Sequence, residues 1–236
     1  MNTVAAMQPY FFPYLGYFKL ISASNHFVIL DDVDFRPRTW MTRNRIISNN
    51  DFFMFSLPVK RASQNRKISE IEIAIDQIWR SKFKKNLFHS YHQTPYFQQS
   101  FDLIESIIDF DATNLTDFLE NSLRTTCSYL EIQSNFQRSS ELDYDKKCFG
   151  VERILSLCEL LKTDFYLNLP GGRHLYHANR FTCRDIKLGF IRQNSMPSDG
   201  IPNNVISDCS IIHSMMLSPP SEIRDSINSI SIDFVN

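Results

Sequence analysis

The stretch AAMQPYFFPYLGYFKLISASNHFVILDDVDFRPRTWMTRNR, residues 5–45, holds aromatic residues, prolines, carboxylates and arginines more densely than any later part of the chain. Residues 4–7 form a short apolar run that predicts a strand. Pro9 and Pro13 exclude a helix across the tyrosine- and phenylalanine-rich turn that follows. Residues 15–23 are compatible with a helix. The chain is therefore expected to start as strand, turn and helix.

A second strand is predicted at residues 27–30, where the apolar run FVIL is continuous. Such runs are typical of strands buried on both faces of a parallel sheet. The run leads directly into Asp31 and Asp32, so both carboxylates are expected at the carboxyl end of this strand. Binding sites of parallel α/β sheets form at that edge.

Basic residues follow in residues 40–47, a segment that is expected to be extended. Because side chains alternate along a strand, Arg43 and Arg45 should point to one side and Asn44 to the other. The sequence thus predicts that two carboxylates and two guanidinium groups come from neighbouring segments.

The rest of the chain alternates between strand and helix patterns. Further strands are predicted at residues 52–59, 68–75, 132–136, 165–169 and 186–191, the last of which should be the final strand. Amphipathic helices are predicted at residues 79–91 and 97–110, with a third capped by Asn114. A turn is expected at residues 139–141, helices at 151–161 and 210–217, and a loop at 195–204.

This order of elements favours an α/β fold with a mixed sheet, with α+β as the alternative. We expect one domain over residues 1–236, with a helical insertion at about residues 79–131. A chain of this length buries roughly 70% of its unfolded surface, so its core needs no disulfides.

Composition excludes several classes of protein. A net charge of −1 and scattered basic residues argue against a nucleic-acid partner. Residues 1–6 lack the basic segment of a signal peptide, and the apolar runs are shorter than the roughly 18 residues of a membrane helix. We therefore expect a cytoplasmic protein without a membrane span. Six glycines without a dinucleotide or P-loop motif mean that a bound nucleotide must be held by side chains.

Several acidic and basic side chains are candidates for chemistry. Asp31, Asp32 and Asp34 form a D-D-x-D motif that could bind a divalent cation beside a diphosphate. Alternatively, Asp31 or Asp32 acts as a general base, or the carboxylates are solvated at a strand end. Arg43 and Arg45 could bind phosphate or carboxylate through the guanidinium fork, or neutralise the aspartates.

The other candidate groups give weaker patterns. Tyr10 and Tyr14 are the aromatic residues that we assign to a pocket wall. The histidines lack a nearby cysteine or carboxylate that would complete a zinc site, so no metal and no cofactor are expected. The five cysteines include no C-x-x-C pair and are expected to be buried free thiols.

Three stretches resemble the WbqC-like protein family: MQPYFFPYLGYF (7–18), FVILDDV (27–33) and WMTRNRI (40–46). Similar features recur at LPV (57–59), TPYF (94–97), SSE (139–141), GVERI (150–154) and GGRHLY (171–176), so that the resemblance spans nearly the whole chain. The positions that match the family motifs are Gln8, Pro9, Tyr10, Pro13, Asp31, Asp32, Arg43, Asn44 and Arg45.

The resemblance implies a function in bacterial O-antigen or related surface polysaccharide biosynthesis. It implies an N-acyl or aminoacyl transferase that acts on the amine of a nucleotide-linked amino-deoxy sugar. The thioester donor would be an acyl or peptidyl carrier protein, or coenzyme A.

Roles for the matching residues follow from that reaction. Arg43 and Arg45 would hold the diphosphate, and Tyr10 and Tyr14 would line the pocket. The side chains of Gln8 and Asn44 would form hydrogen bonds to the sugar or the donor carbonyl. Either catalytic carboxylate, Asp31 or Asp32, would accept the amine proton, and direct attack by the amine needs no cysteine nucleophile.

Two alternatives remain open at this point. One is a glycosyltransferase in which Asp32 and Asp34 hold Mn²⁺ or Mg²⁺, and the other is a non-catalytic sugar-nucleotide-binding protein. The chain also departs from the family pattern at SIIH (210–213), where relatives usually read SIID. If that Asp is catalytic, His213 replaces it or activity is impaired; if it caps a helix, the change is mild.

Overall fold

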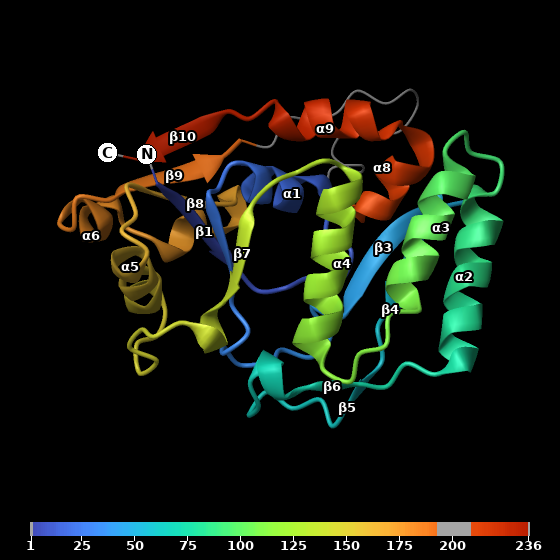
Figure 1. The fold of residues 1–236 in the computed structure, drawn as a ribbon, viewed down its shortest axis with the longest axis horizontal. Helices are drawn as coiled ribbons and strands as arrows, with labels where there is room; N and C mark the ends of the chain where they lie inside the picture. Colours follow the sequence, from blue (N-terminus) through green and yellow to red (C-terminus); the bar gives the residue numbers. More distant parts are fainter. Residues whose placement is uncertain (1, 193–208, 236) are drawn as a thin grey trace.

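A six-stranded, mostly parallel sheet forms the centre of the computed structural model, which describes residues 2–192 and 209–235 (Figure 1). The fold is α/β with a mixed sheet, as the order of elements predicts. The strands of this sheet are β1 (Thr3–Met7), β2 (His26–Ile29), β7 (Asn135–Arg138), β8 (Phe165–Asn168), β9 (Lys187–Ile191) and β10 (Ile232–Val235).

The strand order is β10-β9-β8-β1-β2-β7, with β10 antiparallel to β9 and the other pairs parallel. From β1 the chain runs outward to β2 and β7, and it then returns to the opposite side of β1 to form β8 and β9. The strand order therefore changes direction between β1 and β8. In α/β sheets, a crevice opens at the carboxyl ends of the strands that flank such a point.

Strand β1 is buried on both faces, as its continuous apolar sequence predicts. Ala5 packs into the core on the side of α1 (Leu15–Ser22), whereas Val4 and Ala6 pack into the core on the side of α5 (Val151–Leu160). Both helices cross over between parallel strands, α1 from β1 to β2 and α5 from β7 to β8. The sheet is therefore a middle layer with helices on both faces.

Three helices lie where the helical insertion is predicted: α2 (Gln77–Tyr91), α3 (Phe97–Ile108) and α4 (Leu115–Tyr129). They stand side by side from the centre to the right of Figure 1. The Asn114 side chain accepts a hydrogen bond of 2.7 Å from the Thr116 amide and caps α4, as predicted. Asp76 caps α2 in the same way, through a 2.7 Å bond from the Trp79 amide. One face of α4 is buried, which explains its amphipathic pattern.

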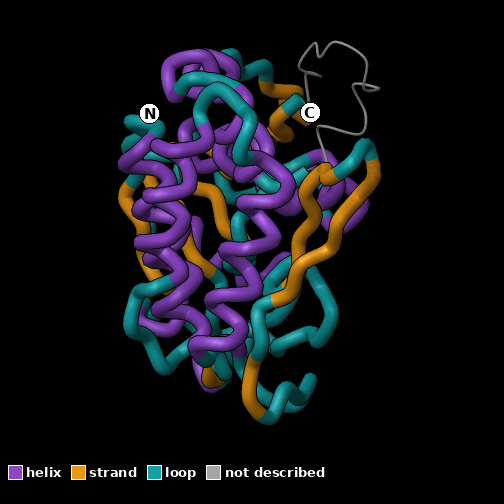
Figure 2. Tube along the Cα trace, turned by 90° about the vertical axis from the view of Figure 1, so that its right-hand side faces the viewer, coloured by secondary structure: helices purple, strands orange, loops and turns teal. Residues whose placement is uncertain are grey.

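The remaining elements surround this core. They are β3 (Arg43–Ser48), β4 (Asp51–Ser56), β5 (Val59–Lys60), β6 (Glu72–Ile73), α6 (Ala178–Thr182), α8 (Ile211–Leu217), α9 (Pro220–Asn228) and the 3-10 turns η1 (Ile68–Glu70), η2 (Ser139–Glu141) and η3 (Pro170–Leu175). Strands β3 and β4 pair with each other outside the six-stranded sheet, as a ribbon at the outer side of the molecule (Figure 2). None of the helices over the described residues is long and apolar enough to cross a bilayer.

The structure corrects several predicted elements. Residues 68–75 form η1 and the short β6 instead of one strand, because the amides of Ile68 and Ser69 bind the carbonyls of Val33 and Asp31. Strand β7 begins at Asn135, three residues later than predicted from position 132. The prediction that residues 186–191 form the final strand is wrong, since β10 follows. The loop predicted at 195–204 lies outside the described residues.

Candidate functional site

A cavity of about 840 Å³ lies at the carboxyl ends of β1, β2 and β8. Its walls come from five parts of the chain: the loop after β1, the segment after β2, strand β3, the start of α5 and the turn after β8. This is the position where the strand order changes direction, and the volume suits a small-molecule ligand. The cavity is therefore the candidate functional site.

The charged side chains in the cavity wall are all basic within the described residues: Arg36, Arg45 and Arg153. Aromatic rings form much of the remaining surface, and they are those of Tyr10, Tyr14, Trp40 and Tyr176. Guanidinium groups recognise phosphate or carboxylate, and aromatic faces stack on bases and sugars. The wall is therefore suited to an anionic ligand with a flat or cyclic part.

Asn44 fixes the loop after β1. Its Nδ2 donates hydrogen bonds to the carbonyls of Phe11 (3.0 Å) and Phe12 (2.6 Å), and its Oδ1 accepts one from the Arg45 amide (2.8 Å). Phe12 has a φ of 45°, a left-handed conformation that costs energy in a residue with a side chain. The Ser210 hydroxyl donates a second bond, of 2.8 Å, to the Phe12 carbonyl. Asn44 and Ser210 together hold this strained turn in place.

The two tyrosines assigned from sequence do lie in the cavity wall. The ring of Tyr10 packs 5.5 Å from that of Tyr17, and burial raises the pKa of the Tyr10 hydroxyl. The Tyr14 ring covers Gly16 so closely that a Cβ at position 16 would lie 2.5 Å from its Cε2. Glycine at 16 therefore lets the Tyr14 ring occupy its place in the wall.

Gly16→Ala is expected to move the Tyr14 ring and to weaken binding of any ligand that stacks on it. Alanine is favoured over glycine inside a helix by about 1 kcal/mol, so the stability of α1 should not fall. Calorimetric dissociation constants and thermal melts of the variant, compared with those of Tyr14→Ala, separate the two effects. Unchanged affinity in Gly16→Ala together with lost affinity in Tyr14→Ala would show that the ring need not move.

The two arginines of β3 differ in position. The Arg45 guanidinium lies in the cavity wall, 4.1 Å from the ring centroid of Phe52 and 5.8 Å from that of Trp40. Arg43 is on the same side of the strand, opposite to the buried Asn44, but does not line the cavity. The alternation along β3 is as predicted, yet only one of the two arginines meets the site.

The carboxylate of Asp31 is enclosed by two serines. It accepts hydrogen bonds from the Ser140 amide (2.9 Å) and the Ser140 hydroxyl (2.7 Å). The Ser139 hydroxyl oxygen lies 3.2 Å away, and its single proton has a nearer acceptor in Asp32. The residue is only 1% exposed and does not line the cavity. Asp31 thus joins the end of β2 to the turn after β7.

Asp32 is connected to the cavity wall through Arg153. Its carboxylate accepts hydrogen bonds from the hydroxyls of Ser139 and Tyr144, both at 2.5 Å, and lies 3.3 Å from Arg153 Nη1. Burial, followed by the contact with Asp32, raises the pKa of the Tyr144 hydroxyl, so that it stays protonated and donates. Asp32 itself does not line the cavity, whereas Arg153 does.

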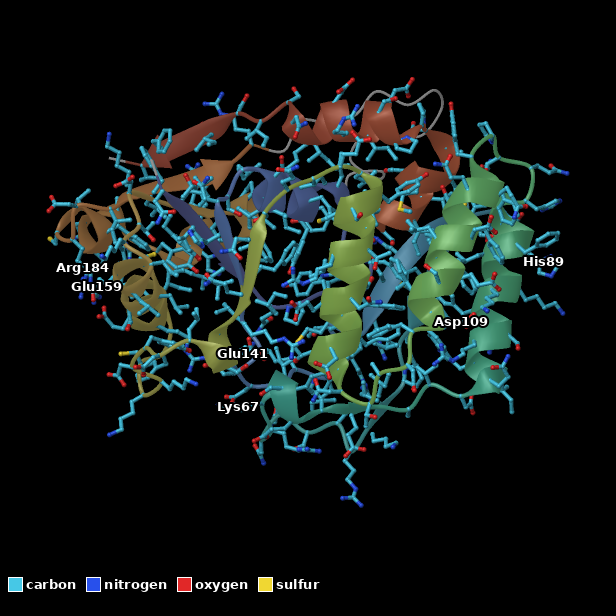
Figure 3. The ribbon with its side chains drawn as sticks, viewed as in Figure 1. Lys67, His89, Asp109, Glu141, Glu159 and Arg184 are labelled. Carbon is cyan, nitrogen blue, oxygen red and sulfur yellow. The ribbon has the colours of Figure 1, made fainter. Side chains whose placement is uncertain are left out.

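Asp34, the third acid of the D-D-x-D motif, points elsewhere. It pairs with Lys67 at 2.6 Å, and this contact lowers the pKa of the Asp34 carboxyl. Lys67 lies at the lower edge of the molecule in Figure 3. Asp34 therefore has a different partner from Asp31 and Asp32, which both lie next to Ser139. The described residues contain no group of three His, Cys, Asp or Glu that could hold a metal ion.

The thiols are only partly buried, contrary to the uniform burial expected. Cys127, Cys158 and Cys209 are buried, Cys148 is intermediate and Cys183 is exposed. Burial raises the pKa of Cys127 and of Cys158 to about 12, which keeps both as unreactive thiols at neutral pH. None of the five lines the cavity.

His213 lies in the interface between α8 and α2, away from the cavity lining. Its Nδ1 is 2.9 Å from the Tyr91 hydroxyl, and its Nε2 is buried without a partner among the described residues. Ser210, not His213, is the N-cap of α8. His213 is thus neither the cap nor a residue of the cavity.

A model of the WbqC-like protein family matches residues 8–225, which include every segment of the cavity wall apart from the end of β1. The chain belongs to the WbqC-like protein family. An uncharacterized protein of Mycobacterium tuberculosis is similar to it, with 29% identity over 190 residues that cover 80% of this chain and 81% of the relative. No solved structure matches the chain significantly.

Five of the stretches that resemble WbqC-like proteins supply residues of the cavity wall, whereas LPV, TPYF and SSE do not. The amino-terminal stretches supply the loop after β1 and strand β3, GVERI supplies Gly150 and Arg153, and GGRHLY supplies Gly171 and Tyr176. Arg153 and Tyr176 were not predicted as site residues from the sequence. Their position within these two short stretches that resemble the family could have indicated them.

Proposed function

We propose that this WbqC-like protein is an N-acyl or aminoacyl transferase that modifies the amine of a nucleotide-linked amino-deoxy sugar. The observation that carries the proposal is the cavity at the switch point of the sheet, whose charged wall residues within the described chain are three arginines. A sugar nucleotide combines the negative charge and the ring systems that such a wall suits. The family resemblance adds bacterial O-antigen or surface polysaccharide synthesis, in the cytoplasm, as the setting.

In this proposal the positive charges of Arg36, Arg45 and Arg153 attract the diphosphate to the cavity, while Tyr10 and Tyr14 stack on the base or sugar. The Gln8 side chain, which also lines the cavity, contacts the sugar or the donor carbonyl. Asn44 acts by holding the loop after β1, because backbone groups already occupy both its Nδ2 hydrogens and its Oδ1.

The proposed reaction is attack of the neutral sugar amine on the thioester carbonyl of the donor. The C–N bond forms, the C–S bond breaks, and the amine proton leaves with the thiol. We assign Asp31 and Asp32 to positioning, because neither lines the cavity and each already accepts several hydrogen bonds. The donor is a carrier protein or coenzyme A thioester.

The glycosyltransferase alternative would need Asp32 and Asp34 on one cation. Their different partners, Arg153 and Lys67, make this less favourable than the acyl transfer. A non-catalytic binding protein would use the same cavity and differ only in the absence of turnover.

Free-amine sugar nucleotides are expected to stabilise the protein selectively in a thermal-shift panel. The panel compares dTDP- and UDP-linked 3-amino and 4-amino sugars with their N-acetylated and hydroxyl counterparts. A ligand at about 100 times its dissociation constant adds about 2.7 kcal/mol of stability, which a melt resolves. Ligands that stabilise are then assayed for turnover with thioester donors.

Equal shifts by amino and hydroxyl sugars that require Mn²⁺ would favour the glycosyltransferase. Binding without turnover for every donor would favour the non-catalytic protein. The absence of any shift would contradict a sugar-nucleotide ligand.

A further inference from the structure

Arg153 is held in one orientation by the protein. Its Nε donates to the Cys148 carbonyl at 3.1 Å, and its Nη1 lies 3.3 Å from both the carbonyl and the carboxylate oxygen of Asp32. The side chain is only 11% exposed, although it lines the cavity. No described residue accepts a hydrogen bond from its Nη2. The guanidinium thus has two nitrogens bound by protein and one left for a ligand.

A buried hydrogen-bond network supports this orientation from behind. Tyr144 donates to one oxygen of the Asp32 carboxylate, and Ser139 donates to the other, which also faces Arg153. Asp32, Ser139 and Tyr144 all lie outside α5, the helix that carries Arg153, so the network forms only in the folded chain. Preorganised groups of this kind bind with little further loss of side-chain entropy.

The position of Arg153 in its helix also points to an anion. It is the third residue of α5, where the helix dipole favours negative charge and disfavours a cation. The N-cap Gly150 supplies no side-chain oxygen to the free amides of the first turn. The acidic residue of that turn, Glu152, instead pairs with Arg180 and Arg184. The helix end therefore adds positive potential beside the guanidinium, whose own charge is partly offset by Asp32.

We propose that Arg153 is the phosphate-binding residue of the cavity, with Nη2 bound to a phosphate oxygen, and that Asp32 and Tyr144 are its positioning residues. The inference rests on the proposed function, because it takes the ligand to be nucleotide-linked. It assigns the diphosphate end of that ligand to the wall formed by the start of α5. Arg36 is exposed, and Arg45 lies against the rings of Trp40 and Phe52.

The test measures dissociation constants of UDP, dTDP and inorganic pyrophosphate by titration calorimetry at several salt concentrations, with uridine and thymidine as uncharged probes. Arg153→Gln is expected to weaken the diphosphates at least about tenfold, since a charge-assisted contact is lost. It should leave nucleoside affinity unchanged and reduce the salt dependence. Arg153→Lys should fall between Gln and wild type, because it keeps the charge without the planar fork.

Tyr144→Phe tests the positioning role. It should weaken diphosphate binding by a smaller factor and keep the wild-type salt dependence, because the cation remains. Arg224→Gln is the matched control, since its guanidinium pairs with Glu131 and belongs to α9, which does not line the cavity. This variant should bind every probe as wild type does.

The outcomes separate the two proposals. Wild-type protein that binds neither nucleoside diphosphate would contradict the proposed function itself. Wild-type binding with unchanged affinity in Arg153→Gln and Arg153→Lys would overturn the role of Arg153 and leave the function standing. If Arg153→Gln does not fold, the other two variants decide. Unchanged diphosphate affinity in both Arg153→Lys and Tyr144→Phe would also overturn the role of Arg153.

Discussion

Replacing Asp31 by alanine is expected to lower the free energy of unfolding by about 3 kcal/mol, because buried donors lose their charged acceptor. The Asp31 carboxylate accepts hydrogen bonds from the amide and the hydroxyl of Ser140 and lies next to the Ser139 hydroxyl. At 1% exposure, water cannot replace these contacts without a rearrangement. The bonds connect the end of β2 with η2, so their loss should loosen the carboxyl edge of the sheet. Urea denaturation measures the change.

Asp34→Ala is the matched control for this experiment. Asp34 belongs to the same acidic motif but forms an exposed ion pair with Lys67, and such pairs contribute at most about 1 kcal/mol. An Asp31→Ala protein that is as stable as wild type and yet inactive would contradict a structural role. In that case the carboxylate would return as a candidate general base.

Acidification is expected to destabilise the protein through His213. Burial lowers the pKa of His213 from 6.5 to about 4 in the folded protein. The unfolded chain therefore binds the proton more tightly, and stability falls as the pH drops from about 6.5 towards 4. The full effect of this one group is about 3 kcal/mol, and it is absent above pH 7. Urea denaturation at pH 7, 5 and 4 measures it.

His213→Asn isolates the contribution of the imidazole. Asparagine does not titrate, and its side chain can still form a hydrogen bond with the Tyr91 hydroxyl. The variant should lose less stability than wild type between pH 7 and 4, while the control His89→Asn, at an exposed position on the outer face of α2 (Figure 3), should follow wild type. Identical pH dependence in His213→Asn and wild type would mean that His213 is already charged or solvated in the folded state.

Much of the local structure follows from sequence. Continuous apolar runs identified β2 and β8, and amphipathic spacing with a capping asparagine identified α4. These features depend on neighbours within a few residues, which a sequence displays directly. Strand β10 escaped prediction because its pairing with β9 is a long-range contact; among the described residues, α8 and α9 lie between the two strands.

The site was less predictable than the fold. Gln8, Tyr10, Tyr14, Asn44 and Arg45 all line the cavity, whereas Arg43, Asp31 and Asp32 do not. The alternation along β3 placed Asn44 on the opposite side from the arginines but did not reveal that backbone carbonyls would occupy its amide. Whether these residues bind a substrate stays a prediction.

That Asp31 and Asp32 follow a buried strand can be read from the sequence, because a continuous apolar run directly precedes them. Their hydrogen-bond and ion-pair partners depend on the folded chain. Asp32 meets Arg153, 121 residues along the chain, because the crossover from β7 to β8 brings the start of α5 to the same edge of the sheet. Charge attraction acts between any acid and any nearby base, so the pairing depends on which elements the packing of the core places together.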